Sequence, residues 1–211
     1  MTTHRGHMTT FLHTCIPFAP DLNLGRAYNV VMEALPAHGW ACLLDHDVMF
    51  TTAQWYTQLL DAIAQQPEGT FVACTNRVGP NGSRFGWQRV ESVSPLVHDM
   101  ALHREVGRRL AETSTLRDIT DEAKPFAGFL MCVSKETWQA VGGFREGFRY
   151  VDYGFTLDLR RAGRRAYLIE GLYLYHWRRA DGAEAPKGEL AITPAEYQII
   201  KQKVLQSKEV A

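Results

Sequence analysis

The feature that most constrains the fold is a regular alternation of apolar runs and helical patterns in the N-terminal part of the chain. Apolar runs at 10–16, 40–45 and 70–76 are typical of buried strands. Between them, apolar residues recur at helical spacing over 24–35 and 55–63. Strands that alternate with helices of this length pack as a mostly parallel, mixed sheet with helices on both faces. The pattern therefore predicts an α/β fold.

Several of these elements carry start and stop signals. Asn23 precedes the first helical pattern as an N-cap and Pro36 ends it, and Thr51 or Thr52 is expected to cap the second helix. Near the end of the chain, Thr-Pro-x-Glu at 193–196 is typical of a helix start and predicts a final amphipathic helix.

The middle of the chain is less regular, and the α/β pattern resumes after it. Residues 79–95 are punctuated by Gly, Ser and Pro, as in a loop or hairpin, and a helix is expected at about 96–112. The later elements are expected to be a strand at 126–134, a short helix from Ser134 to Gly142, a helix ended by Gly163, and an extended segment at 165–177.

Length and composition favour a single globular domain. The chain has 211 residues, of which 45% are hydrophobic and 22% charged, and these proportions are ordinary for a protein with a full core. Because Lys+Arg and Asp+Glu number 23 each, the balance of charge argues against a general polyanion binder. The opening residues 1–9 are polar, and we expect them to form a disordered leader.

The cysteines indicate a reducing compartment. None of them shows CxxC or Cys/His ligand spacing, and each lies inside an apolar, strand-like run, so we expect buried free thiols. No apolar run approaches the roughly 20 residues that span a bilayer, and no secretory leader is visible. We therefore expect a cytoplasmic protein without a transmembrane segment. The cysteines are Cys15, Cys42, Cys74 and Cys132.

Two aspartates end the apolar run "WACLLDHDVMF", and they are the first candidates for a site. Ligands of open α/β sheets bind beyond the carboxyl ends of the strands, where Asp45 and Asp47 would lie. Two carboxylates separated by one residue suit a hard divalent cation that completes its shell with phosphate and water. The Asp-x-Asp pattern also arises by chance in chains of this size. His46 is not expected to be a ligand, because alternation along a strand would turn it away.

Other phosphate chemistries fit less well. A phosphatase-type Asp-x-Asp-x-Thr carries Thr or Ser two residues after the second aspartate, where this chain has Met49. Neither a Gly-x-Gly-x-x-Gly nor a Gly-x-x-x-x-Gly-Lys loop is present, so dinucleotide and P-loop phosphate sites lack support.

A resemblance to a known family strengthens the metal-site interpretation. The run "FAGFLMCVSKETWQAVGGFREGFRYVDYGFTLDLRRAG", followed by "LYLYHW", resembles the C-terminal half of family 2 glycosyltransferases, which have the GT-A fold. "LGRAYNVVMEAL" and "WACLLDHDVMF" resemble the helix and Asp-x-Asp segment of the same family. The likeness runs from about Phe11 to Arg178, and the pieces occur in the family's order.

The resemblance implies a role for several residues. Asp45 and Asp47 match the pair that holds Mn²⁺ or Mg²⁺ on the diphosphate of a nucleotide-sugar. His176 matches a late histidine that often supplies a third ligand, although a lone histidine there is also typical of a satisfied core or rim residue. Asp152 matches the general base of inverting members, but it could equally be a helix N-cap.

The resemblance also suggests contacts to the donor. Thr14, Ile16 and Pro17 match the end of the first strand, which usually cradles the nucleoside base. Arg26 and Arg77 lie near the expected phosphate edge and either contact donor phosphate or sugar or are simply solvated.

The chain departs from the family pattern in two places. The acidic motif commonly reads Glu-Asp-x-Asp, whereas this chain has Val-Asp-Tyr-Gly at 151–154, which leaves Asp152 as the single base candidate. The stretch between the first strand and the first helix is also short, and Asp21 is the candidate to replace the missing nucleoside contact.

Together these observations predict a single Rossmann-like GT-A domain at 10–211, with a nucleotide-sugar-binding half at 10–78, an acceptor-side half at 79–192 and a C-terminal helix at 193–211. The expected activity is that of a metal-dependent, hexosyltransferase-like enzyme that moves a sugar, with a UDP-sugar as leading donor, onto a hydroxyl acceptor with inversion. The acceptor could be a glycan, a lipid-linked intermediate, a protein or a modified nucleic acid.

Two rivals share this sheet. One is a catalytically inactive sugar-nucleotide or glycan-binding module. The other is a sugar-nucleotide pyrophosphorylase, which normally opens with a Gly-rich, Arg-containing loop that "CIPFAPDLNLGR" does not match.

Overall fold

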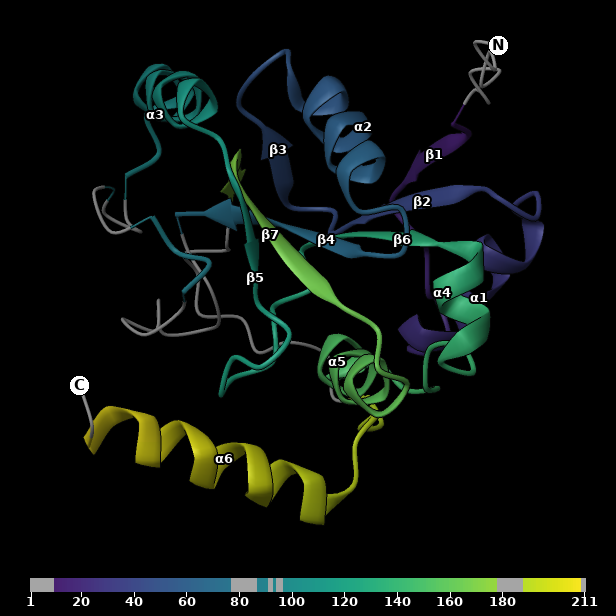
Figure 1. Ribbon diagram of the computed structural model, residues 1–211. Helices are drawn as coiled ribbons and strands as arrows, with labels where there is room; N and C mark the ends of the chain where they lie inside the picture. The colour runs from purple at the N-terminus through teal and green to yellow at the C-terminus, as the bar shows by residue number, and fades with distance from the viewer. Residues whose placement is uncertain (1–9, 77–86, 91–92, 94–96, 178–187, 210–211) are drawn as a thin grey trace, which may run out of the picture.

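The chain folds as a seven-stranded sheet flanked by helices (Figure 1). The structure, a computed structural model, describes residues 10–76, 87–90, 93, 97–177 and 188–209, with side chains described up to residue 203. The strands are β1 (Leu12–Cys15), β2 (Trp40–Leu44), β3 (Val48–Phe50), β4 (Thr70–Thr75), β5 (Leu116–Asp118), β6 (Leu130–Ser134) and β7 (Ala166–His176). The helices are α1 (Leu24–Ala34), α2 (Trp55–Gln65), α3 (Met100–Glu112), α4 (Lys135–Ala140), α5 (Val151–Arg161) and α6 (Pro194–Glu209).

The sheet is mixed, with strand order β1-β2-β6-β4-β7-β3 and with β5 paired to β7. β1–β2 and β4–β7 are parallel, whereas β2–β6, β4–β6, β3–β7 and β5–β7 are antiparallel. The predicted α/β class is confirmed, but the prediction of a mostly parallel sheet is wrong. An apolar run does not encode strand direction, and β6 lies between β2 and β4 and runs antiparallel to both.

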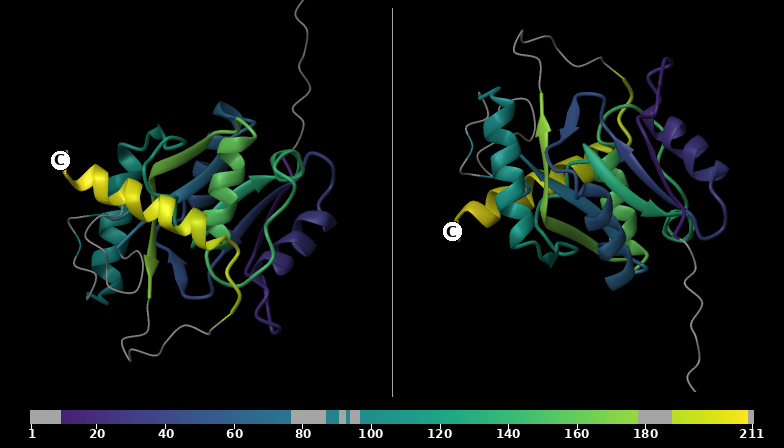
Figure 2. Two further views of the ribbon diagram at one scale, coloured as in Figure 1. Left: turned by 90° about the horizontal axis from the view of Figure 1, so that it is seen from below. Right: turned by 90° about the horizontal axis from the view of Figure 1, so that it is seen from above.

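Helices cover both faces of the sheet, as predicted. Side chains of β2 alternate between the faces: Ala41 and Leu43 pack in one apolar cluster with residues of α1 and α5, and Trp40, Cys42 and Leu44 pack in another with α2. In Figure 1 and Figure 2, α6 lies outside α5, on the same side of the sheet.

Most helix ends follow the sequence signals. Asn23 caps α1 by accepting a hydrogen bond from the Arg26 amide at 3.0 Å, and Ser134 caps α4 in the same way. The predicted cap of α2 is wrong. That helix begins later, at Trp55, and the Thr51 hydroxyl instead donates a hydrogen bond to the Tyr173 carbonyl at 2.6 Å.

Three further sequence predictions concern the cysteines, the segments at 1–9 and 79–95, and helix α3. All four cysteines are free; Cys42, Cys74 and Cys132 are buried as predicted, whereas Cys15 is only partly buried. Burial raises the pKa values of the Cys42 and Cys74 thiols to about 12, in keeping with unreactive thiols. The expected leader at 1–9 and most of the loop at 79–95 lie outside the described residues. Helix α3 begins at Met100, four residues after the predicted start at 96.

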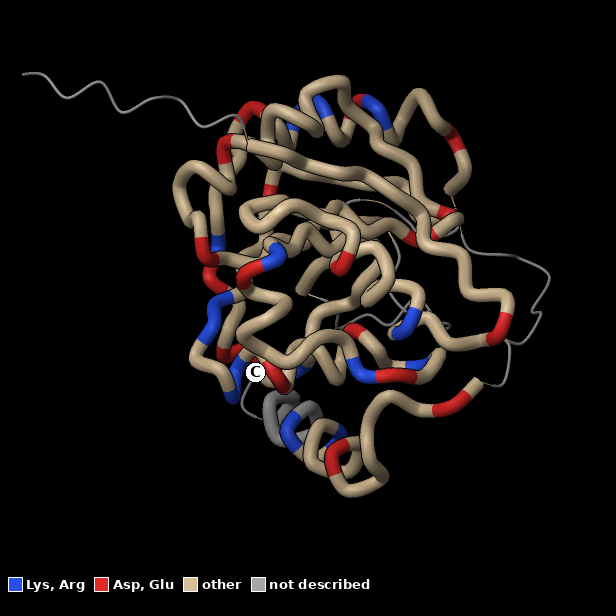
Figure 3. The backbone as a smooth tube through the Cα atoms, turned by 90° about the vertical axis from the view of Figure 1, so that its right-hand side faces the viewer, with Lys and Arg blue, Asp and Glu red and all other residues tan. Residues whose placement is uncertain are grey.

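The surface carries charges of both signs. Figure 3 shows Lys and Arg interspersed with Asp and Glu along the described backbone, in line with a formal net charge of zero. Among the described residues, no helix combines the length and apolarity needed to cross a membrane.

Candidate metal centre

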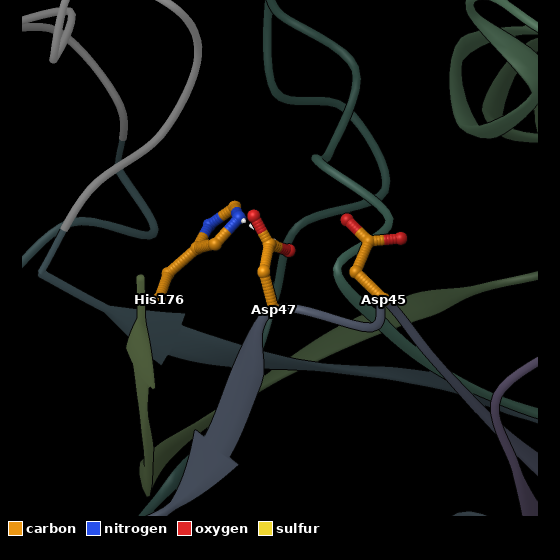
Figure 4. Close-up of side chains that lie close together, drawn as sticks. All are labelled: Asp45, Asp47 and His176. Carbon is orange, nitrogen blue, oxygen red and sulfur yellow. Dashed lines mark ion pairs between the residues drawn. The ribbon is translucent and has the colours of Figure 1, made fainter. Parts of the chain in front are cut away.

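Asp45, Asp47 and His176 lie together at one edge of the sheet (Figure 4). Their ligand atoms all lie within 4.8 Å of one another, and the three side chains point to the same side. The Asp47 Oδ1 and His176 Nε2 atoms are 3.2 Å apart. Carboxylate oxygens and an imidazole nitrogen at this spacing are suited to hold a divalent metal ion.

The pairing of β3 with β7 creates this arrangement. After Asp45 the chain turns, and Val48 of β3 pairs with His176 in antiparallel register. The Trp177 amide donates a hydrogen bond to the Asp47 carbonyl at 2.8 Å. The end of β7 is also held by Asn76, whose side chain accepts a hydrogen bond from the His176 amide at 2.8 Å. Backbone pairing therefore brings the three side chains together.

The two aspartates have different electrostatic surroundings. Burial raises the pKa of Asp45. The charge of His176 partly offsets this rise, and the negative charges of Asp47 and Asp152 add to it. Desolvation acts on Asp47 too, but the hydrogen bond and charge of His176, with smaller help from His46, lower the pKa of Asp47 overall. Within the described part of the chain, no donor hydrogen-bonds to the Asp45 carboxylate. A bound cation would supply the missing positive charge.

His46 lies between the two aspartates in sequence but outside their cluster. Its side chain is exposed, and it is not a member of the group of possible metal ligands. This placement matches the sequence expectation.

Asp152 lies in the first turn of α5, and it is not the N-cap. The N-cap residue is Tyr150, which has a φ of 63° in the left-handed region. The Asp152 carboxylate accepts hydrogen bonds from the Gly128 amide at 2.8 Å and the Tyr153 amide at 2.9 Å. Burial raises the pKa of Asp152 to about 6, although these backbone hydrogen bonds oppose the shift.

The dipeptide Gly128–Phe129 connects Asp152 to the metal centre. The Phe129 carbonyl accepts a hydrogen bond from the Asp45 amide at 3.0 Å. The centroids of the Phe129 and His176 rings are 5.7 Å apart. At Gly128, an added Cβ would lie 2.7 Å from the Cβ of Asp152, so a side chain there would push the carboxylate away. Sequence reasoning treated this segment only as a strand.

Three of the predicted donor-side residues come from the first strand and the residues that follow it. Thr14, Ile16 and Pro17 lie at the carboxyl end of β1, where Cys15 pairs with Leu43, so they share the sheet edge with Asp45.

The other predicted donor-side residues are two arginines, Arg26 and Arg77. Arg26 is exposed and forms an ion pair with Asp21. Arg77 lies outside the described residues.

The structure also brings to the site residues that sequence reasoning missed. Tyr28 of α1 is buried, and its pKa is raised first by burial and then by the charges of Asp45 and Asp152. Beside Asp152, the ring centroid of Tyr150 lies 5.2 Å from that of Tyr153 and 5.5 Å from that of Tyr197 in α6. The helical spacing of Tyr28 marks it as a core position, and nothing in the sequence pairs it with the aspartates.

Comparisons with known proteins do not identify the chain: no model of a known protein family and no curated protein matches it.

Proposed function

We propose that this protein is a metal-dependent glycosyltransferase with the GT-A fold, which transfers a sugar from a nucleotide-diphosphate sugar to a hydroxyl acceptor with inversion. The observation that carries the proposal is the grouping of Asp45, Asp47 and His176 within 4.8 Å, linked through Gly128–Phe129 to Asp152. A UDP-sugar is the leading donor, as the family resemblance implies.

The residues present fit Mn²⁺ or Mg²⁺. Asp45 has no hydrogen-bond donor among the described residues, and Asp47 and His176 already share a contact that a cation could replace. Such an ion, when bound, stabilises the negative charge that accumulates on a diphosphate leaving group. The three side chains would hold the ion, with the diphosphate completing its coordination.

Asp152 supports the transfer step. An acceptor hydroxyl is a poor nucleophile near neutral pH, and a carboxylate within hydrogen-bond reach helps it attack by taking its proton. Because the pKa of Asp152 is raised to about 6, the carboxylate is more basic than an exposed aspartate and is still ionised at pH 7. Each of its oxygens accepts one backbone N–H, which leaves lone pairs for an acceptor proton.

A thermal-shift panel tests the donor site. We expect Mn²⁺ together with one of a set of nucleoside diphosphates to stabilise the wild-type protein, by about 2.7 kcal/mol at 100 times the dissociation constant. For a chain of this size that corresponds to a rise in Tm of roughly 5–10 °C. Asp47→Ala should remove the Mn²⁺-dependent part of the shift.

The matched control is Asp61→Ala, which removes an exposed carboxylate from α2 and should leave the shift unchanged. If no nucleoside diphosphate stabilises the wild type in a metal-dependent way, the proposed donor site does not exist. Release of nucleoside diphosphate from a nucleotide-sugar then separates a transferase from an inactive binding module, which would bind the donor without consuming it.

A further inference from the structure

The Gln88 side chain is a buried amide that forms hydrogen bonds with backbone groups next to the candidate site. The residue is 3% exposed. Its side-chain nitrogen donates hydrogen bonds to the carbonyls of Ala73 and Ala127, at 3.2 and 3.1 Å. Its side-chain oxygen accepts a hydrogen bond from the Ala127 amide at 2.6 Å. Because the nitrogen and the oxygen both have partners, the amide is held in a single orientation.

Gln88 links β4 to the segment that precedes β6. The two strands pair directly at Val72 and Met131. At the next residue of β4, the Ala73 carbonyl accepts its hydrogen bond from Gln88, and the same side chain holds the segment before β6. The backbone of Gln88 is itself attached to β4, since its carbonyl accepts a hydrogen bond from the Thr75 amide at 2.9 Å. The side chain therefore extends the contact between β4 and β6 beyond their direct pairing.

The segment that Gln88 holds leads directly to the metal centre. Two residues after Ala127, the Phe129 carbonyl accepts a hydrogen bond from the Asp45 amide at 3.0 Å. The ring centroid of Phe129 lies 5.7 Å from that of His176. Because Gln88 forms hydrogen bonds with both the amide and the carbonyl of Ala127, it restrains the chain just before these contacts. The position of Phe129, and with it that of the Asp45 backbone, therefore depends on Gln88.

The same end of β4 also supports the histidine of the centre. Asn76 directly follows β4, and its side-chain oxygen accepts a hydrogen bond from the His176 amide at 2.8 Å. The end of β4 is thus a common support for two of the three candidate ligands: His176 through Asn76, and Asp45 through Gln88 and Phe129.

We propose that Gln88 is a positioning residue for the candidate metal centre. It holds residues 127–129 against β4, so that Asp45 keeps its place beside Asp47 and His176. This inference rests on the metal site of the proposed function. Groups behind the ligands of a metal ion orient those ligands, and their loss weakens metal affinity although every ligand is still present.

Gln88→Met tests the inference, because methionine has nearly the same length and lacks the amide. The probe is Mn²⁺ alone, measured by isothermal titration calorimetry well below the Tm of each protein. We expect the dissociation constant of Mn²⁺ to rise about tenfold, since the loss of a residue that orients metal ligands weakens affinity by roughly 10–100-fold. The Tm should fall as well, because the carbonyl of Ala73 and both backbone groups of Ala127 lose their partner.

Thr137→Val is the matched control. Thr137 is fully buried, and its hydroxyl donates a hydrogen bond to the Glu68 carbonyl at 3.3 Å. It lies in α4, which follows the end of β6 opposite to Phe129. This variant should also lower the Tm, but it should leave the dissociation constant of Mn²⁺ within about twofold of the wild-type value.

Gln88→Glu decides the question if Gln88→Met does not fold. Burial favours the protonated form of this glutamic acid, which keeps one donor and an acceptor at nearly the same positions. Because one of the hydrogen bonds is still lost, we expect the dissociation constant of Mn²⁺ to rise about threefold.

The outcomes are distinct. Wild-type affinity for Mn²⁺ in a folded Gln88 variant would show that Gln88 only stabilises the fold, and would overturn the inference while the proposed function stands. Equal weakening by Gln88→Met and Thr137→Val would overturn it too, because the loss would then follow stability rather than position. If the wild type binds no Mn²⁺, the metal centre fails and the inference falls with it. A wild type that binds Mn²⁺ but no nucleoside diphosphate would contradict the proposed function alone.

Discussion

At the scale of single residues, the candidate site is a set of polar groups that the fold holds in unfavourable surroundings. Asp45 and Asp152 are both partly buried, and the negative charge of Asp152 adds to the rise in the pKa of Asp45. Perturbed groups of this kind cluster at functional sites, because burial and like charges tune them for binding or proton transfer. A cation or hydrogen-bond donor that pairs with these groups would offset the free energy cost of their surroundings.

Asp152 makes the stability of the protein depend on pH. Its pKa is raised from 3.8 to about 6 on folding, so between about pH 4 and 6 the folded state keeps a proton that the unfolded state has lost. The stabilising contribution is complete below about pH 4 and is lost as the pH rises through 6. At about 1.4 kcal/mol per pKa unit, the loss of this contribution should lower the free energy of unfolding of the wild type by about 2–3 kcal/mol across this window. Asp152→Asn should remove that fall, which urea unfolding measures.

The comparison of the two proteins reports on Asp152 together with its effect on Asp45, whose pKa the charge of Asp152 helps to raise. Identical pH dependence in wild type and variant would contradict the raised pKa. The same variant should bind nucleoside diphosphate with Mn²⁺ as the wild type does, yet release none from a nucleotide-sugar. Full turnover by Asp152→Asn would exclude it as the base.

At the scale of elements, α1 and the loop before α5 behave as one unit. The Asn29 side chain accepts hydrogen bonds from the Trp138 indole at 2.9 Å and the Phe144 amide at 2.8 Å, and donates one to the Phe144 carbonyl. The Asn23 side chain accepts a hydrogen bond from the Gly147 amide at 3.0 Å. Because this loop leads directly into α5, these hydrogen bonds form a clamp that ties α1 to the start of α5.

Asn29→Ala should therefore destabilise the protein by about 2–4 kcal/mol, because it leaves the indole N–H and both backbone groups of Phe144 without their partner. Urea unfolding measures the change in the free energy of unfolding. Glu33→Ala, an exposed position on the same helix, should change it by less than about 0.5 kcal/mol. Equal effects of the two substitutions would mean that the clamp does not stabilise the fold.

At the scale of the whole molecule, one arginine joins three segments. The Arg145 guanidinium pairs with Asp158 of α5 at 2.7 Å and with Glu196 of α6 at 2.8 Å, and Arg161 also contacts both carboxylates. These pairs hold α6 outside α5 (Figure 1), where α6 contributes Tyr197 to the tyrosines beside Asp152. The hydrogen bond and charge of Arg145 lower the pKa of Glu196 well below its ordinary value.

Replacing Arg145 by Met keeps the apolar stem and removes the charge. We expect a loss of about 2 kcal/mol, less than for a fully buried pair because solvent screens these groups and Arg161 remains. Hydrogen exchange should show faster exchange in α6 than in the sheet, since α6 loses its main polar contacts. The control is Arg165→Met, which breaks an exposed pair with Asp118. Unchanged exchange in α6 would show that apolar contacts alone hold it.

The sequence predicted the features that depend on neighbouring residues. The helical periods, the Asn23 and Ser134 caps and the apolar runs of β2, β4, β6 and β7 are local patterns, and local patterns determine which segments become helices or strands. The family resemblance pointed to Asp45, Asp47 and His176 as a set, and the structure brings them together.

Other features were decided by the tertiary structure. β3 and β5 are three-residue strands that exist because each pairs with β7, and the direction of β6 depends on how the chain reaches the sheet. Arg26 pairs with Asp21, a contact that no local pattern indicates. Tyr28 follows the same helical spacing as the core residues around it, and only the packed structure exposes its pKa to the charges of Asp45 and Asp152. Periodicity and capping act between residues a few positions apart, whereas a site depends on which distant segments are buried together.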